Sequence, residues 1–519
     1  MPKVYKPVVL VILDGFGVWR EQRGNPTYLA SLPHLTEISR FYPGVALNAS
    51  GIDVGLNWGE VGSSEVGHYN IGSGLVTYQN LPRIQFALKD GSFFKLKIWD
   101  ELIQHAEKNN GKIHLMGLLS NGGIHAHIDH LLTVLELLKQ RGVRQPILVH
   151  VFTDGQDAPP GSAKQFIEIL ENKIKELGIG KIATVTGRHY ALDKSENWEL
   201  TERTYDCLVN AKGAVIHSPL EAMAENDEFV KPSVVVDANN QPVGKIDKGD
   251  AIFFFNFRAD RARQLTQLFI NKKLENLFLG TMTEYQKDYP AKVAMPAAPI
   301  KYPMTKVISQ AGKKQFHIAE TEKYAHITYF LNSGVETPFL GEDRAIIPSP
   351  KVDSYDIQPE MSAYQITERV LEELKNKKYD FIAINFANPD LVAHTGNIEA
   401  AAHALTVVDN CIGKIVPATI TQEGAVVITA DHGNVEEMLT LATGKVDTEH
   451  STNFVPCWIV TPDNKMGRNN VKTEALPEIT PSGILADIAP TVLELMDLPP
   501  APEMTGRSLV QSIDTLVLK

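Results

Sequence analysis

Acidic and imidazole side chains stand directly after apolar runs of this chain, where they could bind metal ions. The run from Ala425 to Ala430 is followed at once by Asp431 and His432. Apolar runs of this length fit buried parallel strands, and ligand sites of open α/β sheets gather at the carboxyl ends of the strands. A single Asp-His pair is more often part of an ordinary turn. The pair therefore indicates a metal site only if other strand ends carry the same residue types.

Two further strand ends do carry them. The run 8–13 leads into Asp14, and the run 381–386 is followed by Asp390 and His394, so three strand ends deliver five candidate ligands. Carboxylates and imidazoles without a thiolate cluster suit two divalent ions such as manganese or zinc, whereas an all-oxygen set would favour magnesium or calcium. We predict two metal ions, with manganese preferred.

A loop of small residues could add a nucleophile to such a site. Glycines crowd around Ser63 and Ser64 in the stretch 59–68, as a backbone must when it presents a hydroxyl closely to a metal or a phosphate. A plain turn is the more common reading of such a loop, and His450 could equally be a ligand or an ordinary packing residue. Two metal ions lower the pKa of a serine hydroxyl and neutralise a transferring phosphoryl group, which suits phosphate ester chemistry.

The middle of the chain offers groups that could hold an anionic substrate. Arg188, Arg258 and Arg261 each follow an expected strand, and guanidinium groups bind phosphate and carboxylate through two hydrogen bonds. His125 and Asp157 also follow strands, and Asp157 is a candidate base for a substrate hydroxyl. The alternatives are a solvated basic surface for the arginines and a turn for Asp157.

The separation of these groups along the chain predicts an α/β fold in which one domain is inserted into another. Asp14 lies near one end of the sequence and the segment from Asp390 to His450 near the other, so they must converge to share a site. Between them, strands are expected at 112–119, 146–153, 181–186 and 251–257, and helices at 128–141 and 162–177. We expect a discontinuous metal-binding, phosphatase-like domain (1–78 and 298–519), an inserted phosphotransferase or substrate-binding domain (80–295), and hinges near 78–82 and 295–299.

Composition limits the partners and the compartment. A chain of 519 residues with 43% apolar and 8% aromatic content can fill two cores, and a net charge of −12 disfavours nucleic acid or an anionic membrane as the main partner. Cys207, Cys411 and Cys457 show no Cys-x-x-Cys spacing, which indicates a reducing compartment. The apolar run 8–13 is too short for a signal-peptide core or a membrane span. We expect a cytoplasmic protein, and a monomer.

Six ordered motifs, spread over essentially the whole chain, resemble those of the cofactor-independent phosphoglycerate mutase family of the alkaline phosphatase superfamily. They are LDGFG at 13–17, SEVGH at 64–68, FNFRADR at 255–261, ETEKYAH at 320–326, NPD at 388–390 with His394, and TADHGN at 429–434. The resemblance implies an alkaline-phosphatase-like three-layer αβα domain with a second α/β domain inserted into it. It also implies interconversion of 2- and 3-phosphoglycerate in glycolysis and gluconeogenesis, through a phosphoserine and without bisphosphoglycerate. The alternatives are a metal-dependent phosphatase or phosphodiesterase of the same superfamily, or a protein that binds metal and ligand without turnover.

The resemblance also implies a role for each matching residue. Ser64 would be the nucleophile, Asp157 would carry the hydroxyl proton, and Lys323 would assist phosphoryl transfer. One ion would be held by Ser64, Asp14, Asp431 and His432, and the other by Asp390, His394 and His450. The substrate-binding residues would be His125, Gln156, Asp157, Arg188, Lys194, Arg258, Arg261 and Lys323.

Two of these positions depart from the family pattern, and the resemblance also explains why a second domain is inserted. Gln156 and Lys194 stand where the family usually has arginine: Lys194 keeps the charge but loses the planar guanidinium, and Gln156 loses the charge. A mutase must retain its dephosphorylated product until the phosphate returns, and a closing second domain would exclude water.

Overall fold

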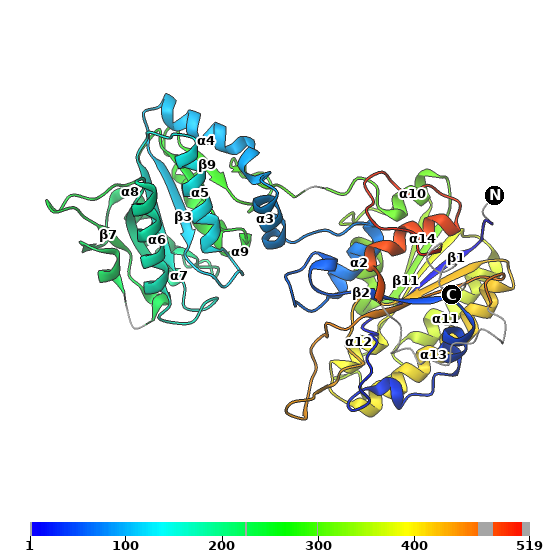
Figure 1. Cartoon of the computed structure of the whole chain (residues 1–519). Coiled ribbons are helices and arrows are strands. Elements are labelled where there is room, and N and C mark those ends of the chain that lie inside the picture. Colours follow the sequence, from blue (N-terminus) through cyan, green and yellow to red (C-terminus); the bar gives the residue numbers. More distant parts are fainter. Residues whose placement is uncertain (1–2, 224–225, 298, 466–480, 511–519) are drawn as a thin grey trace. The chain divides into compact units, whose positions relative to one another are not determined.

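The chain forms two compact units, each built around a mixed β-sheet. The computed structural model describes residues 3–223, 226–297, 299–465 and 481–510. Unit 1 comprises Met1–Pro82 and Pro299–Lys519, and unit 2 comprises Arg83–Ala298 (Figure 1). Both units are α/β, as predicted, and no helix in the described ranges is long and apolar enough to cross a membrane.

The sheet of unit 1 places three apolar strands side by side at its centre. β1 (Val8–Leu13) pairs in parallel with β13 (Phe381–Phe386) on one side and β14 (Ala425–Thr429) on the other. Every residue of these strands is buried, because helices cover both faces of the sheet. The full strand order is β12 (Glu342–Ile347), β11 (Gln315–Glu320), β13, β1, β14, β17 (Val455–Val460), β2 (Gly44–Asn48) and β18 (Pro481–Ile484).

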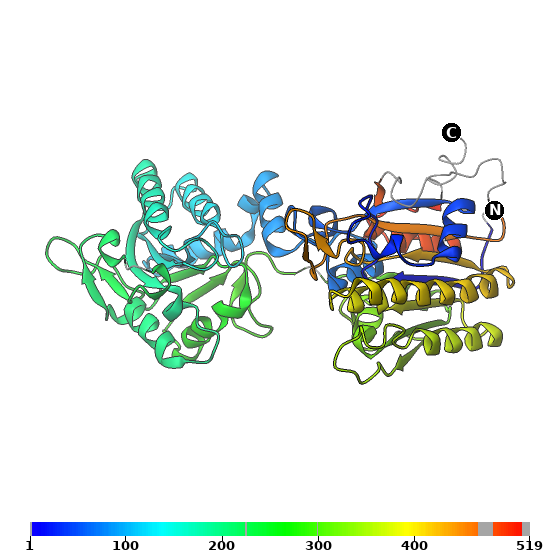
Figure 2. The same cartoon turned by 90° about the horizontal axis from the view of Figure 1, so that it is seen from below.

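Helices complete a three-layer arrangement in unit 1. α11 (Ala363–Asn376) and α13 (Ile398–Ile420) pack together on one face, and Figure 2 shows them side by side. α2 (Ser64–Ser73), α10 (Met304–Gln310) and α14 (Ile488–Leu495) pack together on the other face (Figure 1). In α11 the buried residues Ile366, Val370 and Leu374 recur every four positions, so a single apolar stripe of this helix faces the sheet. α1 (Pro33–Phe41) packs against α13.

Unit 2 repeats the α/β pattern. Its strand order is β10 (Lys292–Val293), β9 (Phe278–Thr281), β8 (Ala251–Phe254), β3 (Ile113–Leu118), β4 (Ile147–Thr153), β5 (Lys181–Gly187), β7 (Ser233–Val235) and β6 (Ala214–Ile216). Its helices α5 (Ile128–Gln140) and α6 (Ala163–Leu177) pack together, as do α8 (Trp198–Asn210) and α9 (Ala259–Lys272), while α4 (Lys97–Lys108) packs on β8 and β9.

Most predicted elements of unit 2 agree with the structure to within one residue, but the strand predicted at 251–257 ends at Phe254. The backbone N–H groups of Phe257 and Arg258 donate to the carbonyl of His125 instead of continuing the ladder. This apolar run therefore leaves the sheet early and joins a loop at the carboxyl edge.

The chain passes from unit 1 to unit 2 after Pro82 and returns after Ala298. α3 (Asn80–Lys89) begins inside the first predicted hinge segment, so the chain there is helical. The hinge function of 78–82 and of 295–299 stays a prediction.

Candidate active site

Parallel strand pairing brings the predicted metal ligands of unit 1 to one edge of its sheet. Asp14 follows β1, and Asp431 and His432 follow β14. Asp390 lies on the short helix α12 (Asn388–Ala393) after β13. Because Leu13 lies opposite Phe386, and Ile12 opposite Thr429, the three strands end together. Residues almost 420 positions apart in sequence thus become neighbours, as the hydrogen bond from the Gly15 N–H to Asp431 shows.

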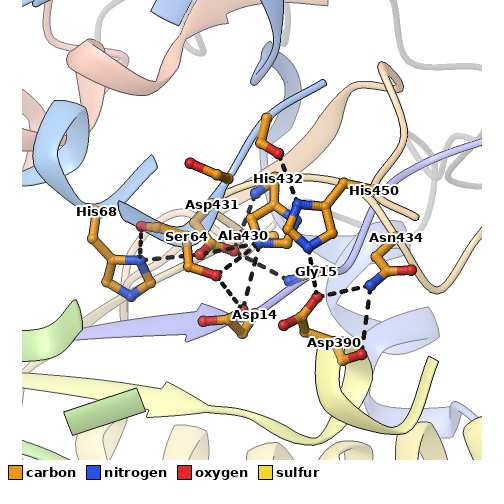
Figure 3. A network of polar contacts seen from close by, with 12 residues as sticks. Asp14, Gly15, Ser64, His68, Asp390, Ala430, Asp431, His432, Asn434 and His450 are labelled. Carbon is orange, nitrogen blue, oxygen red and sulfur yellow. Dashed lines mark hydrogen bonds and ion pairs between the residues drawn. The ribbon is translucent and has the colours of Figure 1, made fainter. Parts of the chain in front are cut away.

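The first group of donor atoms surrounds the predicted nucleophile. One ligand atom each of Asp14, Asp431 and His432 lies within 4.8 Å of the others, and all three residues are fully buried. The hydroxyl oxygen of Ser64 is 2.9 Å from Nε2 of His432 and 3.2 Å from Oδ1 of Asp14 (Figure 3). Ser64 is the first residue of α2, and Ser63 caps this helix by accepting a hydrogen bond from the N–H of Val66.

The second group lies beside the first. It contains one ligand atom each of Asp390, His432 and His450, again within 4.8 Å of one another. Nε2 of His394 is 3.3 Å from Oδ1 of Asp390 and 3.1 Å from Nε2 of His450. His432, predicted for the first ion alone, therefore lies within reach of both groups.

Both groups fit a divalent cation. Their donors are carboxylate oxygens and imidazole nitrogens, with the Ser64 hydroxyl beside the first group, which suits manganese or zinc. The buried carboxyl groups of Asp14, Asp390 and Asp431 face one ammonium, that of Lys323, so the rest of their counter-charge must come from protons on neighbouring imidazoles or from a metal ion. Buried charge of this kind needs a counter-charge, and a cation would supply it.

Lys323 lies between the two groups. It ends the short 3-10 helix Thr321–Lys323, which follows β11. Its Nζ is 2.6 Å from Asp14, 2.6 Å from Asp390 and 2.8 Å from the Ser64 hydroxyl. Burial alone would lower the pKa of Lys323, but the charges of Asp14 and Asp390 outweigh it and raise the pKa above its usual value. The amine therefore stays charged at neutral pH and can donate to the Ser64 oxygen.

The imidazoles of His450 and His394 have raised pKa values. Burial lowers the pKa of His450, but its hydrogen bond and attraction to Asp390 outweigh this and raise the pKa to about 9. The hydrogen bond to Asp390 also raises the pKa of His394. A metal ion must displace these protons, so binding at this group depends on pH.

In unit 2, three predicted residues meet at the carboxyl edge of the second sheet. Arg188, at the start of α7 (Arg188–Ala191), donates to Asp154 at 2.5 Å and to Asp157 at 2.7 Å. Nδ1 of His125 lies 2.6 Å from the other oxygen of Asp157. Burial would raise the pKa of Asp157, but the hydrogen bonds from His125 and Arg188 lower it to about 2. The result is a buried carboxylate that orients an imidazole, an arrangement suited to moving a proton.

The other predicted residues of unit 2 are at least partly exposed. Arg258 is half exposed and pairs with Asp260 at 3.1 Å, while Arg261 donates to the carbonyl of Leu192 at 3.3 Å. Lys194 is exposed.

Gln156 is also exposed, and its amide donates to Glu228 at 2.6 Å. The structure thus joins Asp157, Arg188 and His125 in one network. Asp260 lies 3.6 Å from Nε2 of His125 and accepts hydrogen bonds from the guanidinium of Arg258 and the backbone N–H of Arg261, so both arginines lie at the edge of this network.

Several residues behind the ligands were not identified from the sequence. His68 lies 3.0 Å from Asp431 and 3.0 Å from the amide of Asn385, which donates in turn to Asp14 at 2.7 Å. A signal for Asn385 was present, since it is a polar residue inside a wholly buried apolar strand. His68 could have been found because it follows Ser64 by four residues on a helix and so shares its face.

Comparison with known proteins gives a consistent picture. Residues 6–500 match the family model of the metalloenzyme superfamily. The 2,3-bisphosphoglycerate-independent phosphoglycerate mutase of Clostridium botulinum (strain Langeland) is 46% identical over 98% of this chain and 99% of its own. The corresponding mutases of Clostridium tetani and Chloroflexus aggregans are 47% and 44% identical, each over at least 97% of both chains. A solved structure of Leishmania mexicana phosphoglycerate mutase, at low cobalt concentration, is 27% identical over 98% of both chains, with a TM-score of 0.55.

Proposed function

The chain belongs to the 2,3-bisphosphoglycerate-independent phosphoglycerate mutases of the metalloenzyme superfamily, and from this premise we propose how its residues carry out the reaction. The protein is an isomerase of glycolysis that acts on phosphoglycerate without bisphosphoglycerate. The proposal assigns the nucleophile and the metal ions to unit 1, and the residues that hold the glycerate to unit 2.

Ser64 is the proposed carrier of the phosphoryl group. Its oxygen attacks the phosphorus of bound phosphoglycerate, the bond between phosphorus and the glycerate oxygen breaks, and a proton passes to that oxygen. In the second step the other hydroxyl of the glycerate loses its proton and attacks the phosphorus of the phosphoserine, the bond between phosphorus and the Ser64 oxygen breaks, and the Ser64 oxygen regains the proton that it lost in the first step. The supporting observation is that the Ser64 hydroxyl contacts Asp14, His432 and Lys323 within 3.2 Å.

Two manganese ions are the proposed metals, one held by Asp14, Ser64, Asp431 and His432 and the other by Asp390, His394 and His450. When bound, they lower the pKa of the serine hydroxyl and offset the charge of the transferring phosphoryl group. Carboxylate and imidazole donors support manganese over magnesium. His432 lies within reach of both groups, so it could bind either ion.

Lys323 is proposed to stabilise negative charge during the transfer. Its ammonium already donates to the Ser64 oxygen at 2.8 Å and is held in place by Asp14 and Asp390. A fixed donor aimed at the position where charge develops lowers the barrier without having to reorganise.

Unit 2 is proposed to bind and reorient the glycerate. Asp157, with His125 hydrogen-bonded to it, exchanges the proton of the glycerate hydroxyl, while Arg188 holds the carboxylate of Asp157 in place. Arg258, Arg261, Lys194 and Gln156 are proposed to contact the anionic groups of the substrate. Closure about the segments 78–82 and 295–299 would retain the glycerate until the phosphate returns.

We also propose that the protein is a cytoplasmic monomer. The cytoplasmic location is supported by the three cysteines, which are all buried free thiols, as expected in a reducing compartment: Cys207, Cys411 and Cys457. Gel filtration coupled to light scattering would test the monomer, and a trimer or dimer mass would contradict it.

The arrangement that carries the proposal is the Ser64 hydroxyl held between Lys323 and the two donor groups. The test is to incubate the metal-free protein with 3-phosphoglycerate and Mn²⁺, and to measure both 2-phosphoglycerate and inorganic phosphate. We expect isomerisation that requires Mn²⁺, with little phosphate released and no stimulation by bisphosphoglycerate. Release of phosphate as the main product would instead indicate a phosphatase, and full activity of verified metal-free protein would contradict the two-metal site.

A further inference from the structure

A buried carboxylate outside the ligand set joins three of the segments that carry metal ligands. The side chain of Glu436 is fully buried. One of its oxygens accepts hydrogen bonds from the backbone N–H groups of Gly17 and Asn434, each at 2.9 Å. The other accepts hydrogen bonds from the hydroxyl of Ser451 and from the amide of Asn453, the latter at 3.0 Å. A carboxylate can accept about four hydrogen bonds, so Glu436 uses its full capacity here.

Each bonded segment lies close to a metal ligand in sequence. Gly17 follows Asp14 by three residues, Asn434 follows His432 by two, and Ser451 is adjacent to His450. The first two ligands belong to the donor group around Ser64, and His450 belongs to the other group. A single side chain therefore ties together loops from both groups.

Asn434 extends the connection to the remaining segment. Its side-chain amide donates to Oδ1 of Asp390 at 2.8 Å (Figure 3). The same amide lies 3.4 Å from Nε2 of His394, and the backbone N–H of Asn434 donates to Glu436. All four ligand-bearing loops are thus linked to Glu436 either directly or through one residue.

The backbone also closes tightly around this carboxylate. A Cβ atom added at Gly17 or at Gly433 would overlap the carboxyl group of Glu436. The two glycines, one in each of the motifs at 13–17 and 429–434, are therefore needed for the close approach. Because the backbone of these loops lies in close contact with Glu436, a change in the hydrogen bonds of Glu436 should shift the positions of the loops.

We propose that Glu436 is a positioning residue that sets the separation of the two metal-ligand groups and thereby the affinity of the protein for both ions. The inference rests on the two-ion site proposed above. Outer partners of this kind change metal affinity because they fix the orientation of the ligands.

The decisive variant is Glu436→Gln, which keeps the shape but places an amide N–H₂ against two of the four donors. Metal-free protein is titrated with Mn²⁺ in a calorimeter, and thermal unfolding of the metal-free protein is recorded alongside. We expect both binding steps to weaken, by about 10- to 100-fold. Glu437→Gln is the matched control, because Glu437 lies next to Glu436 in the chain and, among the described residues, its carboxylate accepts a hydrogen bond from Asn453 alone. Its Mn²⁺ affinity should stay within about twofold of wild type.

A second variant, Ser451→Ala, removes one hydrogen bond and leaves the carboxylate in place. It should weaken mainly the binding of the Mn²⁺ ion assigned to Asp390 and His450. If Glu436→Gln does not fold, this variant tests the proposed effect of Glu436 on Mn²⁺ affinity. A Glu436→Gln protein, or failing that a Ser451→Ala protein, that melts earlier yet binds Mn²⁺ as wild type would show a merely structural role and overturn the inference. Wild-type protein that binds no Mn²⁺ would overturn the two-ion site itself, and this inference with it.

Discussion

The two candidate sites of this chain differ in how their charges are balanced. In unit 1 the carboxyl groups of Asp14, Asp390 and Asp431 are buried around a single ammonium, and further positive charge comes from protons on imidazoles such as His450. In unit 2 the buried pair of acids, Asp154 and Asp157, is bridged by Arg188, and the other candidate cations are at least partly exposed. A metal ion can replace protons on imidazoles beside buried acids, whereas partly exposed cations beside acids that an arginine already bridges suit an anion. This difference supports metal binding by unit 1 and substrate binding by unit 2.

The largest effect should come from unit 1, by removal of its nucleophile. Ser64→Ala deletes one hydroxyl, which we expect to lower kcat by roughly 10⁴-fold or more, because no phosphoserine can form. The fold should survive, since alanine fits the first turn of α2. The measurement is conversion of 3- to 2-phosphoglycerate, with mass spectrometry for a phosphorylated serine.

Ser63→Ala is the neighbouring control for this experiment. It removes the cap of α2, so stability should fall by about 1 kcal/mol while most activity remains. If Ser64→Ala kept near-wild-type turnover, the covalent mechanism would be wrong.

Unit 2 should show a smaller but still large effect when its acid is neutralised. Asp157→Asn removes the carboxylate that orients His125, and loss of a general acid-base group typically costs about 10²- to 10⁴-fold in kcat. The Mn²⁺ affinity of this variant should not change, because Asp157 belongs to unit 2 and the proposed metal ligands to unit 1. A variant with altered metal binding would contradict the separation of roles between the units.

The elements around the two sites show what the sequence could and could not reveal. The strands at 8–13 and 381–386 were predicted to the residue, because wholly buried parallel strands read as unbroken apolar runs. The candidate metal ligands at the strand ends followed from the same rule. Glu436 did not, because its role depends on hydrogen bonds between segments distant in sequence. Contacts of this kind leave no spacing pattern in the chain.

The predicted substrate-binding residues show a different limit. Arg258 and Arg261 were expected to act together, and both contact Asp260, the first through its guanidinium at 3.1 Å and the second through its backbone N–H at 2.9 Å. Their joint binding of the substrate remains a prediction.

A moderate effect should distinguish the sites through pH. The folded pKa of His450 is raised to about 9 from a usual value near 6.5, so its ion pair with Asp390 stabilises the metal-free protein fully below pH 6.5. That stabilisation is lost as pH rises through 9. Over the same range Mn²⁺ affinity should increase, by up to about tenfold per pH unit, because binding releases this proton.

Thermal unfolding of the metal-free protein and Mn²⁺ titrations between pH 6 and 10 would measure both trends. Affinity that stays flat between pH 6 and 9 would mean that His450 is not a ligand. Binding of phosphoglycerate by unit 2 should not depend on the protonation of His450, because His450 belongs to unit 1. The two pH dependences can therefore be compared within one protein.

The smallest effect concerns Gln156, which stands where the family usually has an arginine. The structure shows that its amide donates to Glu228 at 2.6 Å, and both side chains are accessible to solvent. An arginine placed there by Gln156→Arg would meet the Glu228 carboxylate first, so part of its charge would be offset before substrate arrives. An exposed charge pair contributes at most about 1 kcal/mol, so we expect KM for phosphoglycerate to fall by no more than about fivefold, with kcat unchanged. The double variant Gln156→Arg/Glu228→Gln frees the guanidinium and should lower KM further, while Glu228→Gln alone reports the effect of the acid. A rise in KM for Gln156→Arg, both with Glu228 and with Glu228→Gln, would mean that the pocket fits the neutral side chain of Gln156. Positive charge at this position would then not contribute to the binding of phosphoglycerate by unit 2.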